Sequence, residues 1–369
     1  MSTQPPPFHA DAFDEIPSPS LLVWPDRVRK NIVGMISQVE GDVARLRPHV
    51  KTHKMAEVVR LQLEAGIDQF KCATIAEAEM LAMAGARDVL LAYQPVGPNV
   101  GRLAMLAQKF PATSFAALVD DLDALAVMDA RFASEPKPLR LFVDVDCGMG
   151  RTGVATGARE LCEAVSSAGS VALAGLHVYD GHLHQAAVDE RRAGFEAARV
   201  SVQRLIDEVQ PDLVIGGGSP TFGLHAMHAN WQCSPGTTLF WDVGYGGGFP
   251  DLDFEIAAAL LVRVISKPGE NLLCLDLGHK AVGAENPLEN RVRFPGLSAD
   301  LEFVLQSEEH LVVKVPNAGE FSVGDALLGL PIHICPTVAL HMEGVIVSES
   351  GQPSGERWEV AARDRRLTI

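Results

Sequence analysis

Residues 69–93, QFKCATIAEAEMLAMAGARDVLLAY, contain two short apolar runs, at 69–73 and 88–93, separated by a longer stretch with a helical pattern. The same alternation extends from Leu21 to Asp242. Strands that are buried on both faces read as nearly continuous apolar runs, which favours a parallel sheet. Eight such β–α units in about 200 residues predict an α/β fold, a (β/α)8 TIM-type barrel. The apolar runs lie at 45–50, 69–73, 88–93, 114–119, 140–146, 172–178, 213–216 and 237–241.

An open doubly wound sheet is the alternative to the barrel. It normally has fewer units and a GxGxxG turn after its first strand, and the sequence has no such turn. After about residue 255 short β-rich runs are separated by Gly, Pro and charged turns, which predicts a mostly antiparallel domain. We therefore expect the barrel over 25–255 and a β-rich C-terminal domain over 256–369. Residues 15–24, which include the run LLVW, are expected to join the β-domain.

The charge balance argues against several classes of partner. The 369 residues include 31 Lys and Arg against 47 Asp and Glu, a net charge of -16, with no basic cluster. A nucleic acid or an anionic membrane is therefore not an expected partner. The six cysteines have no paired spacing, which indicates a reducing compartment. With no signal-peptide pattern and no apolar run of about 18 residues, the sequence predicts a cytoplasmic protein.

Lys51 lies in LRPHVKTHK, at the end of the first predicted strand, where a TIM barrel carries its catalytic groups. On an extended strand Arg47, His49 and Lys51 point to the same side. A lysine in this position is costly unless it is paired or used chemically. It is either an ion-paired lysine at the rim or a Schiff-base lysine made nucleophilic by partial burial. Lys54, the rival, falls at the predicted helix start and is expected to be solvated.

A glycine-rich stretch, GGGSPT at 216–221, follows the seventh predicted strand. Taken alone it is typical of a tight turn. Between a strand and a helix, however, its amides, that of Gly217 among them, and the Ser219 hydroxyl can bind a phosphate group. Gly236 and Thr237, in CSPGTT, are expected to complete this site, because TIM barrels often bind phosphate at the loops after strands seven and eight.

The segment HVYDGHLH, residues 177–184, carries three histidines and a tyrosine. His177 lies within the predicted strand, so a structural role in the core competes with a functional one. His182 and His184 lie beyond the strand and suit general acid–base catalysis near neutral pH. Metal ligation is the alternative role for these two histidines.

A second candidate site lies in the C-terminal domain. In HIC, residues 333–335, an extended backbone would place the imidazole of His333 and the thiol of Cys335 on one face. The pair can bind one divalent ion, with zinc preferred by the thiolate, and water or substrate would supply the other ligands, as in a catalytic site. The alternative is that Cys335 is a buried thiol that acts as a small hydrophobic side chain.

Several motifs occur in the order in which a known enzyme family has them. The chain resembles the D-threonine aldolase and D-serine dehydratase family, fold-type III pyridoxal-phosphate enzymes related to alanine racemase. The resemblance extends from about Pro19 to about His341, nearly the whole chain. The motifs are RPHVKTHK, KCATIAEAEML, DVDCGMGRTGV, GLHVYDGH, GGGSPT, CSPGT, LDLGHKAV and HICPTVALH.

The resemblance implies a cofactor, a metal and a quaternary structure. Lys51 matches the lysine that carries pyridoxal 5'-phosphate, and a divalent metal, zinc or manganese, is implied in the C-terminal domain. Members of the family are usually homodimers that act on small D-3-hydroxy-amino acids. The other implied cofactor-binding residues are Arg151, Tyr179, Gly218 and Ser219, and the implied metal ligands are His333 and Cys335. His49, on the same side of the predicted strand as Lys51, is a further expected cofactor-binding residue.

The implied reaction is that of a D-threonine aldolase-type lyase, which cleaves D-3-hydroxy-amino acids to glycine and an aldehyde with His182 or His184 as the base. The alternative is a D-serine or 3-hydroxyaspartate dehydratase that releases a 2-oxo acid and ammonia, with Lys51 removing the α-proton. A non-catalytic pyridoxal-phosphate-binding protein is an alternative of another class, but such proteins lack a C-terminal β-domain. A racemase commonly needs a second base, a tyrosine from the C-terminal domain. No tyrosine follows Tyr245, which argues against a racemase.

Overall fold

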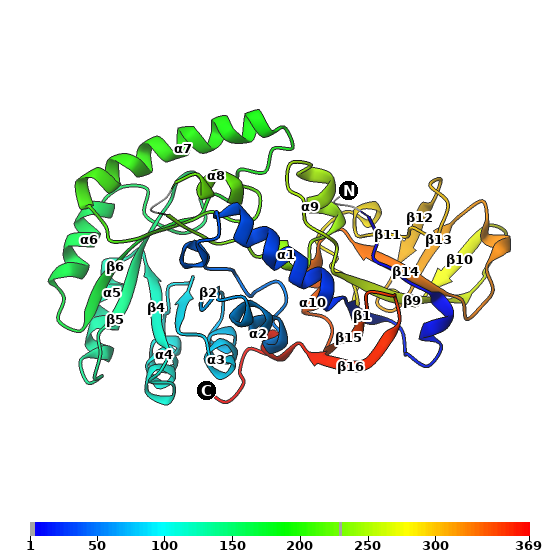
Figure 1. Ribbon diagram of the computed structural model, residues 1–369, viewed down its shortest axis with the longest axis horizontal. Coiled ribbons are helices and arrows are strands. Elements are labelled where there is room, and N and C mark those ends of the chain that lie inside the picture. Colours follow the sequence, from blue (N-terminus) through cyan, green and yellow to red (C-terminus); the bar gives the residue numbers. More distant parts are fainter. Residues whose placement is uncertain (1–3, 229–230) are drawn as a thin grey trace. The chain divides into compact units, whose positions relative to one another are not determined.

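The computed structural model describes residues 4–228 and 231–369 (Figure 1). The chain divides into two compact units, and each is considered by itself. The barrel unit comprises Met35–Lys51, Ala56–Gly236 and Asp364–Ile369, and the β-unit comprises Met1–Gly34, Thr52–Met55 and Thr237–Arg363. The predicted domain boundary at 255/256 stays a prediction.

The barrel unit is built on a parallel sheet whose strands follow one another in chain order (Figure 1). Each strand pairs in parallel with the next, which requires a crossover connection after every strand. This order confirms the predicted alternation of strands and helices. The strands are β2 (Gln69–Cys72), β3 (Asp88–Leu91), β4 (Ser114–Val119), β5 (Leu139–Val145), β6 (Val171–Val178), β7 (Val214–Gly216) and β8 (Trp231–Cys233).

Residues 46–50 take the eighth position and join the two edges of this sheet. On one side the amide of Arg47 donates to the carbonyl of Cys233 at 2.9 Å. On the other side the amide of Val50 donates to the carbonyl of Lys71 at 2.9 Å. The sheet therefore closes into a barrel of parallel segments, which confirms the predicted TIM-type architecture.

Two of the eight predicted strands were wrong in detail. Residues 237–241 begin with the 3-10 helix η3 (Thr237–Leu239), and β8 precedes them. The periodicity of a short, fully buried run does not distinguish a strand from a helical turn. Residues 45–50 do not form a regular strand and pair through isolated bridges, because Pro48 has no amide hydrogen to donate to a ladder.

Helices α3 to α6 pack on the outer side of the barrel strands (Figure 1). Their starts are specified locally. In α3 the Thr74 hydroxyl accepts a hydrogen bond from the amide of Glu77, and the Glu77 carboxylate accepts one from the amide of Ala73. The helices of the unit after Lys51 are α2 (Ala56–Glu64), α3 (Ile75–Ala84), α4 (Pro98–Lys109), α5 (Leu122–Phe132), α6 (Ala158–Ser167), α7 (Val188–Val209) and α8 (Phe222–Ala226).

A charged network lies at the amino ends of the barrel strands. The fully buried Arg47 forms an ion pair with Asp88 at 2.6 Å and donates to Gln232 and Gln69 at 2.8 and 2.7 Å. Arg140 forms an ion pair with the other oxygen of Asp88 at 2.6 Å. Burial by itself raises the pKa of Asp88, but the attraction and hydrogen bonds of the two arginines outweigh it and lower that pKa. This network stabilises the end of the barrel opposite the catalytic end.

The β-unit is a nine-stranded sheet that is antiparallel except where β1 pairs with β15, among the strands described. Strand β1 contains the early apolar run, and its pairing with β9 confirms that this run joins the C-terminal sheet. The strands are β1 (Ser20–Val23), β9 (Ala258–Ser266), β10 (Leu272–Leu275), β11 (Val292–Arg293), β12 (Glu302–Gln306), β13 (Leu311–Lys314), β14 (Ala326–Pro331), β15 (Glu343–Val347) and β16 (Pro353–Glu359).

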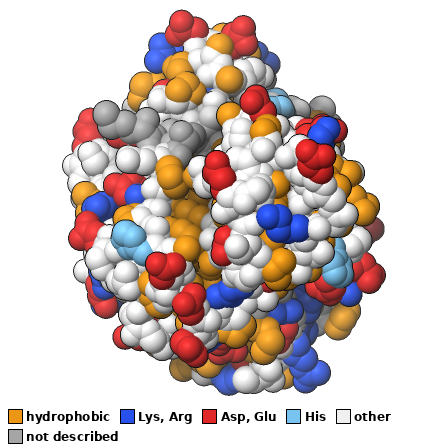
Figure 2. All heavy atoms as spheres, turned by 90° about the vertical axis from the view of Figure 1, so that its right-hand side faces the viewer, with side chains coloured by type: hydrophobic (Ala, Val, Ile, Leu, Met, Phe, Trp, Pro, Cys, Tyr) orange, Lys and Arg blue, Asp and Glu red, His pale blue; other side chains and the backbone are white. Residues whose placement is uncertain are grey.

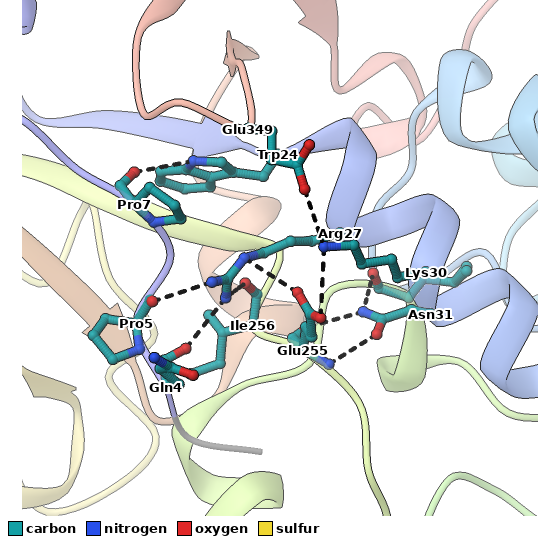
Figure 3. Close-up of polar contacts among 11 residues, drawn as sticks. Gln4, Pro5, Pro7, Trp24, Arg27, Lys30, Asn31, Glu255, Ile256 and Glu349 are labelled. Carbon is teal, nitrogen blue, oxygen red and sulfur yellow. Dashed lines mark hydrogen bonds and ion pairs between the residues drawn. The ribbon is translucent and has the colours of Figure 1, made fainter. Parts of the chain in front are cut away.

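Within the β-unit, Arg27 fastens the N-terminal segment to the start of α1 (Pro25–Gln38) (Figure 3). Its guanidinium donates to the carbonyls of Gln4 and Pro5, both at 3.2 Å, and to that of Ile256 at 3.0 Å. It also forms an ion pair with Glu255 at 3.3 Å. Because one arginine bonds all three backbone carbonyls, it orders a proline-rich segment that has few amide donors of its own.

Acidic, basic and hydrophobic side chains are interspersed on the face drawn in Figure 2. Within residues 4–228 and 231–369, no helix combines the length and apolar character needed to cross a bilayer. None of the six cysteines, all of them in the described part of the chain, forms a disulfide.

Candidate functional site

Lys51 follows the closing segment of the barrel, where the chain turns away from the sheet. Its backbone amide donates to Nδ1 of the buried His49 at 3.2 Å, which holds the start of this turn. Partial burial of Lys51 was expected, but its side chain is exposed, because the strand-like segment ends at the residue before it. The amine is therefore accessible to a small molecule at the catalytic end of the barrel.

Tyr179, just after β6, brings three of the predicted cofactor-binding residues together. The guanidinium carbon of Arg151 lies 4.7 Å from the centre of the Tyr179 ring, a cation–π distance. On the glycine turn, a Cβ added at Gly218 would lie 3.2 Å from a carbon of the same ring. Arg151, Tyr179 and Gly218 therefore line one part of the barrel rim.

The end of β7 and the turn that follows it require glycine at two successive positions. Gly217 has a φ of +69°, and a Cβ there would lie 2.3 Å from a ring carbon of His225. A Cβ at Gly216 would lie 2.4 Å from Nδ1 of the same ring. His225 is itself held by the buried carboxylate of Asp180, at 2.7 Å from its Nε2. Asp180 and His225, which sequence reasoning missed, thus position the turn that is expected to bind phosphate.

Hydroxyl groups beside this turn complete a set of donors for an anion. The amide of Gly236 donates to Oγ of Ser219 at 3.2 Å, so the turns after β7 and β8 are joined. The Oγ of Ser234, two residues earlier, is buried and has no hydrogen-bond partner among the described residues. A phosphorylated aldehyde such as pyridoxal phosphate needs an amine for its aldehyde and amide and hydroxyl donors for its phosphate. The residues of the barrel unit supply both, so they fit this cofactor.

The two histidines predicted as bases differ in their surroundings. His182 packs against the turn after β5, where a Cβ added at Gly148 would lie 3.0 Å from its Nε2. Its Nδ1 is buried without a hydrogen-bond partner among the described residues. His184 is exposed. The structure therefore distinguishes a packed histidine, His182, from a solvated one, His184.

Two charged residues that sequence reasoning did not select, Lys71 and Asp144, lie inside the barrel beside His177. Lys71, in β2, is only 3% exposed, and its Nζ lies 3.4 Å from Nε2 of His177 in β6. Nδ1 of His177 lies 2.7 Å from the carboxylate of Asp144, which also accepts a hydrogen bond from Thr152 at 2.8 Å. A lysine within the four-residue strand QFKC and an aspartate within LRLFVDV were the available signals, because buried strands rarely carry unpaired charges. His177, for which both a structural and a functional role were considered, lies between Lys71 and Asp144.

In the β-unit, the HIC segment is not extended, contrary to expectation. His333 is the N-cap of the short helix α10 (Ile334–Val338), whose first turn contains Pro336. The two predicted ligands still interact. Burial lowers the pKa of His333, but the hydrogen bond and charge of Cys335, together with Glu285 at 2.5 Å from Nδ1, raise it to about 9.

Cys335 is surrounded by hydroxyl groups of its own unit. Its Sγ lies 3.2 Å from Oγ1 of Thr52, the residue after Lys51 in the chain, and 3.7 Å from Oγ1 of Thr237. Among the described residues, no three or more His, Cys, Asp or Glu side chains are grouped to hold a metal ion. An imidazole and a thiol suit a divalent ion whose other ligands come from outside the chain, as predicted from the sequence.

Comparison with known proteins identifies both parts of the chain. Residues 23–243 match the family "Alanine racemase, N-terminal domain", and residues 257–347 match "Putative serine dehydratase domain". The chain is 30% identical to a D-threonine aldolase of Arthrobacter sp over 375 residues, covering 98% of this chain and 97% of that protein. It is 29% identical to a 3-hydroxy-D-aspartate aldolase of Paracoccus denitrificans (strain Pd 1222), over 89% of this chain and 87% of that protein.

A solved structure gives the same result in three dimensions. The crystal structure of D-threonine aldolase from Filomicrobium marinum superimposes with a TM-score of 0.87 at 25% identity, covering 95% of this chain and 96% of that chain. The barrel followed by the β-rich part, the order of the motifs and these similarities agree. The chain belongs to the alanine racemase-like family that includes the D-threonine aldolases and D-serine dehydratases.

Proposed function

We propose that this protein is a pyridoxal-phosphate- and divalent-metal-dependent lyase of the D-threonine aldolase type, which cleaves D-3-hydroxy-amino acids to glycine and an aldehyde. The observation that carries the proposal is the set of groups at the barrel rim. The accessible amine of Lys51, the stacked Arg151 and Tyr179, and the glycine turn at 216–219 belong to one compact unit. The activities named for the relatives are lyase activities on D-3-hydroxy-amino acids.

In this proposal the barrel unit holds the cofactor. Bound pyridoxal phosphate supplies an electron sink for the bond that breaks. Lys51 would hold its aldehyde carbon covalently, and Gly217, Gly218 and Ser219 would donate to its phosphate. Arg151 and Tyr179 would line the site and limit the motion of the ring, with His49 behind the lysine.

The base of the reaction would be a histidine. His182 or His184 would accept the proton of the 3-hydroxyl group, so that the Cα–Cβ bond breaks and the aldehyde leaves. Return of a proton to Cα then completes glycine. His182 is favoured by its fixed position against the turn at Gly148, because a general base works best when it is held in one orientation.

His333 and Cys335 would hold the divalent ion, with zinc favoured by the thiol and manganese as the alternative. The ion would serve as a Lewis acid for the 3-hydroxyl group, which makes its proton easier to remove. Glu285 would orient His333 through the bond to Nδ1, as carboxylates commonly orient metal-binding imidazoles.

A dehydratase is the second candidate, because residues 257–347 match a serine dehydratase domain. Incubation with D-threonine and with D-serine, each with and without a chelator, separates the two. Acetaldehyde and glycine from D-threonine identify an aldolase, whereas pyruvate from D-serine identifies a dehydratase. Full activity after chelation and dialysis would contradict the metal dependence. If the yellow holoenzyme carried out neither reaction, the remaining interpretation would be a non-catalytic pyridoxal-phosphate-binding protein.

The covalent role of Lys51 has its own test. Lys51→Ala should abolish the visible imine absorbance and the turnover of D-threonine, while Lys54→Ala, the matched control, should retain both. An imine band that survives Lys51→Ala would contradict the proposal.

A further inference from the structure

Lys71 is a buried amine whose role the proposed reaction leaves open. It lies in β2, and its backbone is bonded to residues 48 and 50 of the segment that carries Lys51. The side chains of Lys71 and His49 are in register across this parallel pair, so both point to the same side. Lys71 therefore extends into the barrel from the strand next to the cofactor lysine.

The protonation state of His177 determines whether its Nε2 donates or accepts a hydrogen bond toward Lys71. Burial, together with the charge of Lys71, lowers the pKa of His177 despite its bond to Asp144. His177 is therefore neutral at physiological pH. Because Asp144 is an acceptor, the proton of this imidazole lies on Nδ1, 2.7 Å from the carboxylate. Nε2 then carries a lone pair and lies 3.4 Å from Nζ of Lys71. It accepts a hydrogen bond from the amine whether the amine is charged or neutral.

Charges of both signs act on the amine of Lys71. The positive charges of Lys51 and Arg151 destabilise the protonated amine. The negative charges of Asp144 and Asp180 stabilise it. No carboxylate forms an ion pair with Lys71 among the described residues, and its Nζ lies 5.8 Å from the centre of the Tyr179 ring. Burial first, then repulsion by Lys51, lower the pKa of Lys71 to about 7. Such an amine exchanges its proton readily in the range where enzymes use general acids and bases.

We propose that Lys71 is a second acid–base residue of this site, held by the His177–Asp144 pair so that its amine exchanges a proton with a substrate bound beside Tyr179. The proposal rests on the proposed function, which supplies the substrate. In the lyase reaction Lys71 gives its proton to Cα after the Cα–Cβ bond has broken, forming the second C–H bond of glycine. The amine then recovers a proton from water, while the histidine that took the hydroxyl proton releases it to water, so charge and atoms balance.

The titration of Lys71 is measurable in the protein without cofactor or substrate. Carbon-13-labelled lysine gives a side-chain signal that shifts when the amine loses its proton, and the signal missing from Lys71→Arg assigns it. We expect a midpoint near neutral pH that moves upward in Lys51→Met, because the repelling charge is gone. A midpoint at about 10, the usual value for a lysine amine, would overturn the proposal, whatever the activity of the holoenzyme.

The catalytic part is tested by the exchange of the α-hydrogens of glycine in deuterium oxide, followed by proton NMR with the holoenzyme. Lys71→Met should slow this exchange by a factor of about 100 or more. Lys71→Arg retains a positive charge but cannot lose its proton, and it should be equally slow. Exposed Lys137→Met is the matched control and should exchange at the wild-type rate. Exchange by Lys71→Met within a factor of about two of wild type, or rescue by Lys71→Arg, would overturn the acid–base role.

Failure of this inference and failure of the proposed function give different results. If Lys51→Ala keeps the imine band, or the wild type cleaves no hydroxy-amino acid, the proposed function is wrong. If the wild type cleaves D-threonine and Lys71→Met shows normal exchange and an unchanged pH profile of kcat/KM, only the role of Lys71 is wrong. The imine absorbance of Lys71→Met and Lys71→Arg reports separately that each variant is folded and holds the cofactor.

Discussion

Arg47 shows how a single residue can be both costly and necessary. Its guanidinium has no contact with water, yet all three of its nitrogens are bonded, to Asp88, Gln69 and Gln232. A buried charge is tolerated when its hydrogen bonds are complete, and removing one partner leaves the others unpaired. The residue lies two positions from His49 and four from Lys51 in the same segment, so it fixes the register of the chain that carries Lys51.

Replacement of Arg47 by methionine should therefore destabilise the protein strongly. We expect Arg47→Met to lower the free energy of unfolding by about 3–5 kcal/mol, because Asp88 and the two glutamines lose their shared donor. Arg60→Met, which removes an exposed arginine paired with Glu57, should change it by less than about 1 kcal/mol. Urea unfolding followed by circular dichroism measures both, and a similar small loss for the two variants would contradict the role of Arg47.

A buried histidine of the β-unit makes stability depend on pH. His53 is fully buried, accepts a hydrogen bond from the amide of Met55, and leaves Nε2 without a partner among the described residues. Burial lowers its pKa to about 3. Because the unfolded chain binds this proton at a higher pH than the folded chain, the folded state is fully favoured above about pH 6.5 and loses stability as the pH falls toward about 3.

His53→Asn should remove this acid sensitivity, because asparagine keeps an acceptor for the amide but does not titrate. Between about pH 7 and about pH 5, the variant should lose about 2 kcal/mol less unfolding free energy than the wild type. The exposed His310→Asn serves as the control and should follow the wild type. Parallel stability curves for His53→Asn and wild type would show that His53 is not the responsible group.

At the scale of elements, the turn after β7 joins a short strand to a short helix and has little freedom. Asp180, two residues after β6, bonds both Thr221 Oγ1, at 2.9 Å, and His225 Nε2, on either side of the start of α8. The imidazole of His225 then fills the space in which a side chain at Gly217 would lie. Two glycines and one buried carboxylate therefore set the direction in which the amides of this turn point.

Gly217→Ala should weaken the binding of pyridoxal phosphate more than it weakens the fold. The positive φ and the contact with His225 cost about 1–3 kcal/mol, which corresponds to a dissociation constant raised by about 10-fold or more if the turn moves to relieve them. Gly101→Ala, on α4 with open space around its Cβ, should leave cofactor binding unchanged. Titration of the cofactor-free chain with pyridoxal phosphate, followed by imine absorbance, compares the two. Equal affinity would indicate that the turn does not bind the phosphate.

At the scale of the whole molecule, the resemblance to the family predicts an assembly of two chains. We expect light scattering after size-exclusion chromatography to give twice the mass of one chain, with the same mass in the presence and absence of pyridoxal phosphate. A mass equal to one chain, with full activity, would contradict the homodimer. The net charge of -16 opposes non-specific aggregation as a source of the larger mass, because like-charged molecules repel one another.

The sequence by itself determined the β–α alternation, the change to a β-rich pattern after the barrel, and the pairing of the early apolar run with the C-terminal sheet. These features depend on local periodicity and on turn residues, which are read over short stretches. The family motifs also allowed Lys51, Tyr179 and the glycine turn to be selected. The position of the eighth strand and the helical start at Ile334 could not be predicted from the sequence. In short buried runs the hydrophobic periodicity does not distinguish a strand from a helix.

Only the tertiary structure decided the contacts between distant residues. Lys71 and His177 are 106 residues apart, and Asp144 and His177 are 33 apart, so no local pattern relates them. Closure of the barrel brings their strands to one interior, where low polarity makes each unpaired charge costly and couples it to its neighbours. The charge of a buried lysine is thus a property of the closed barrel, because burial and Lys51 act on it only once the strands have met.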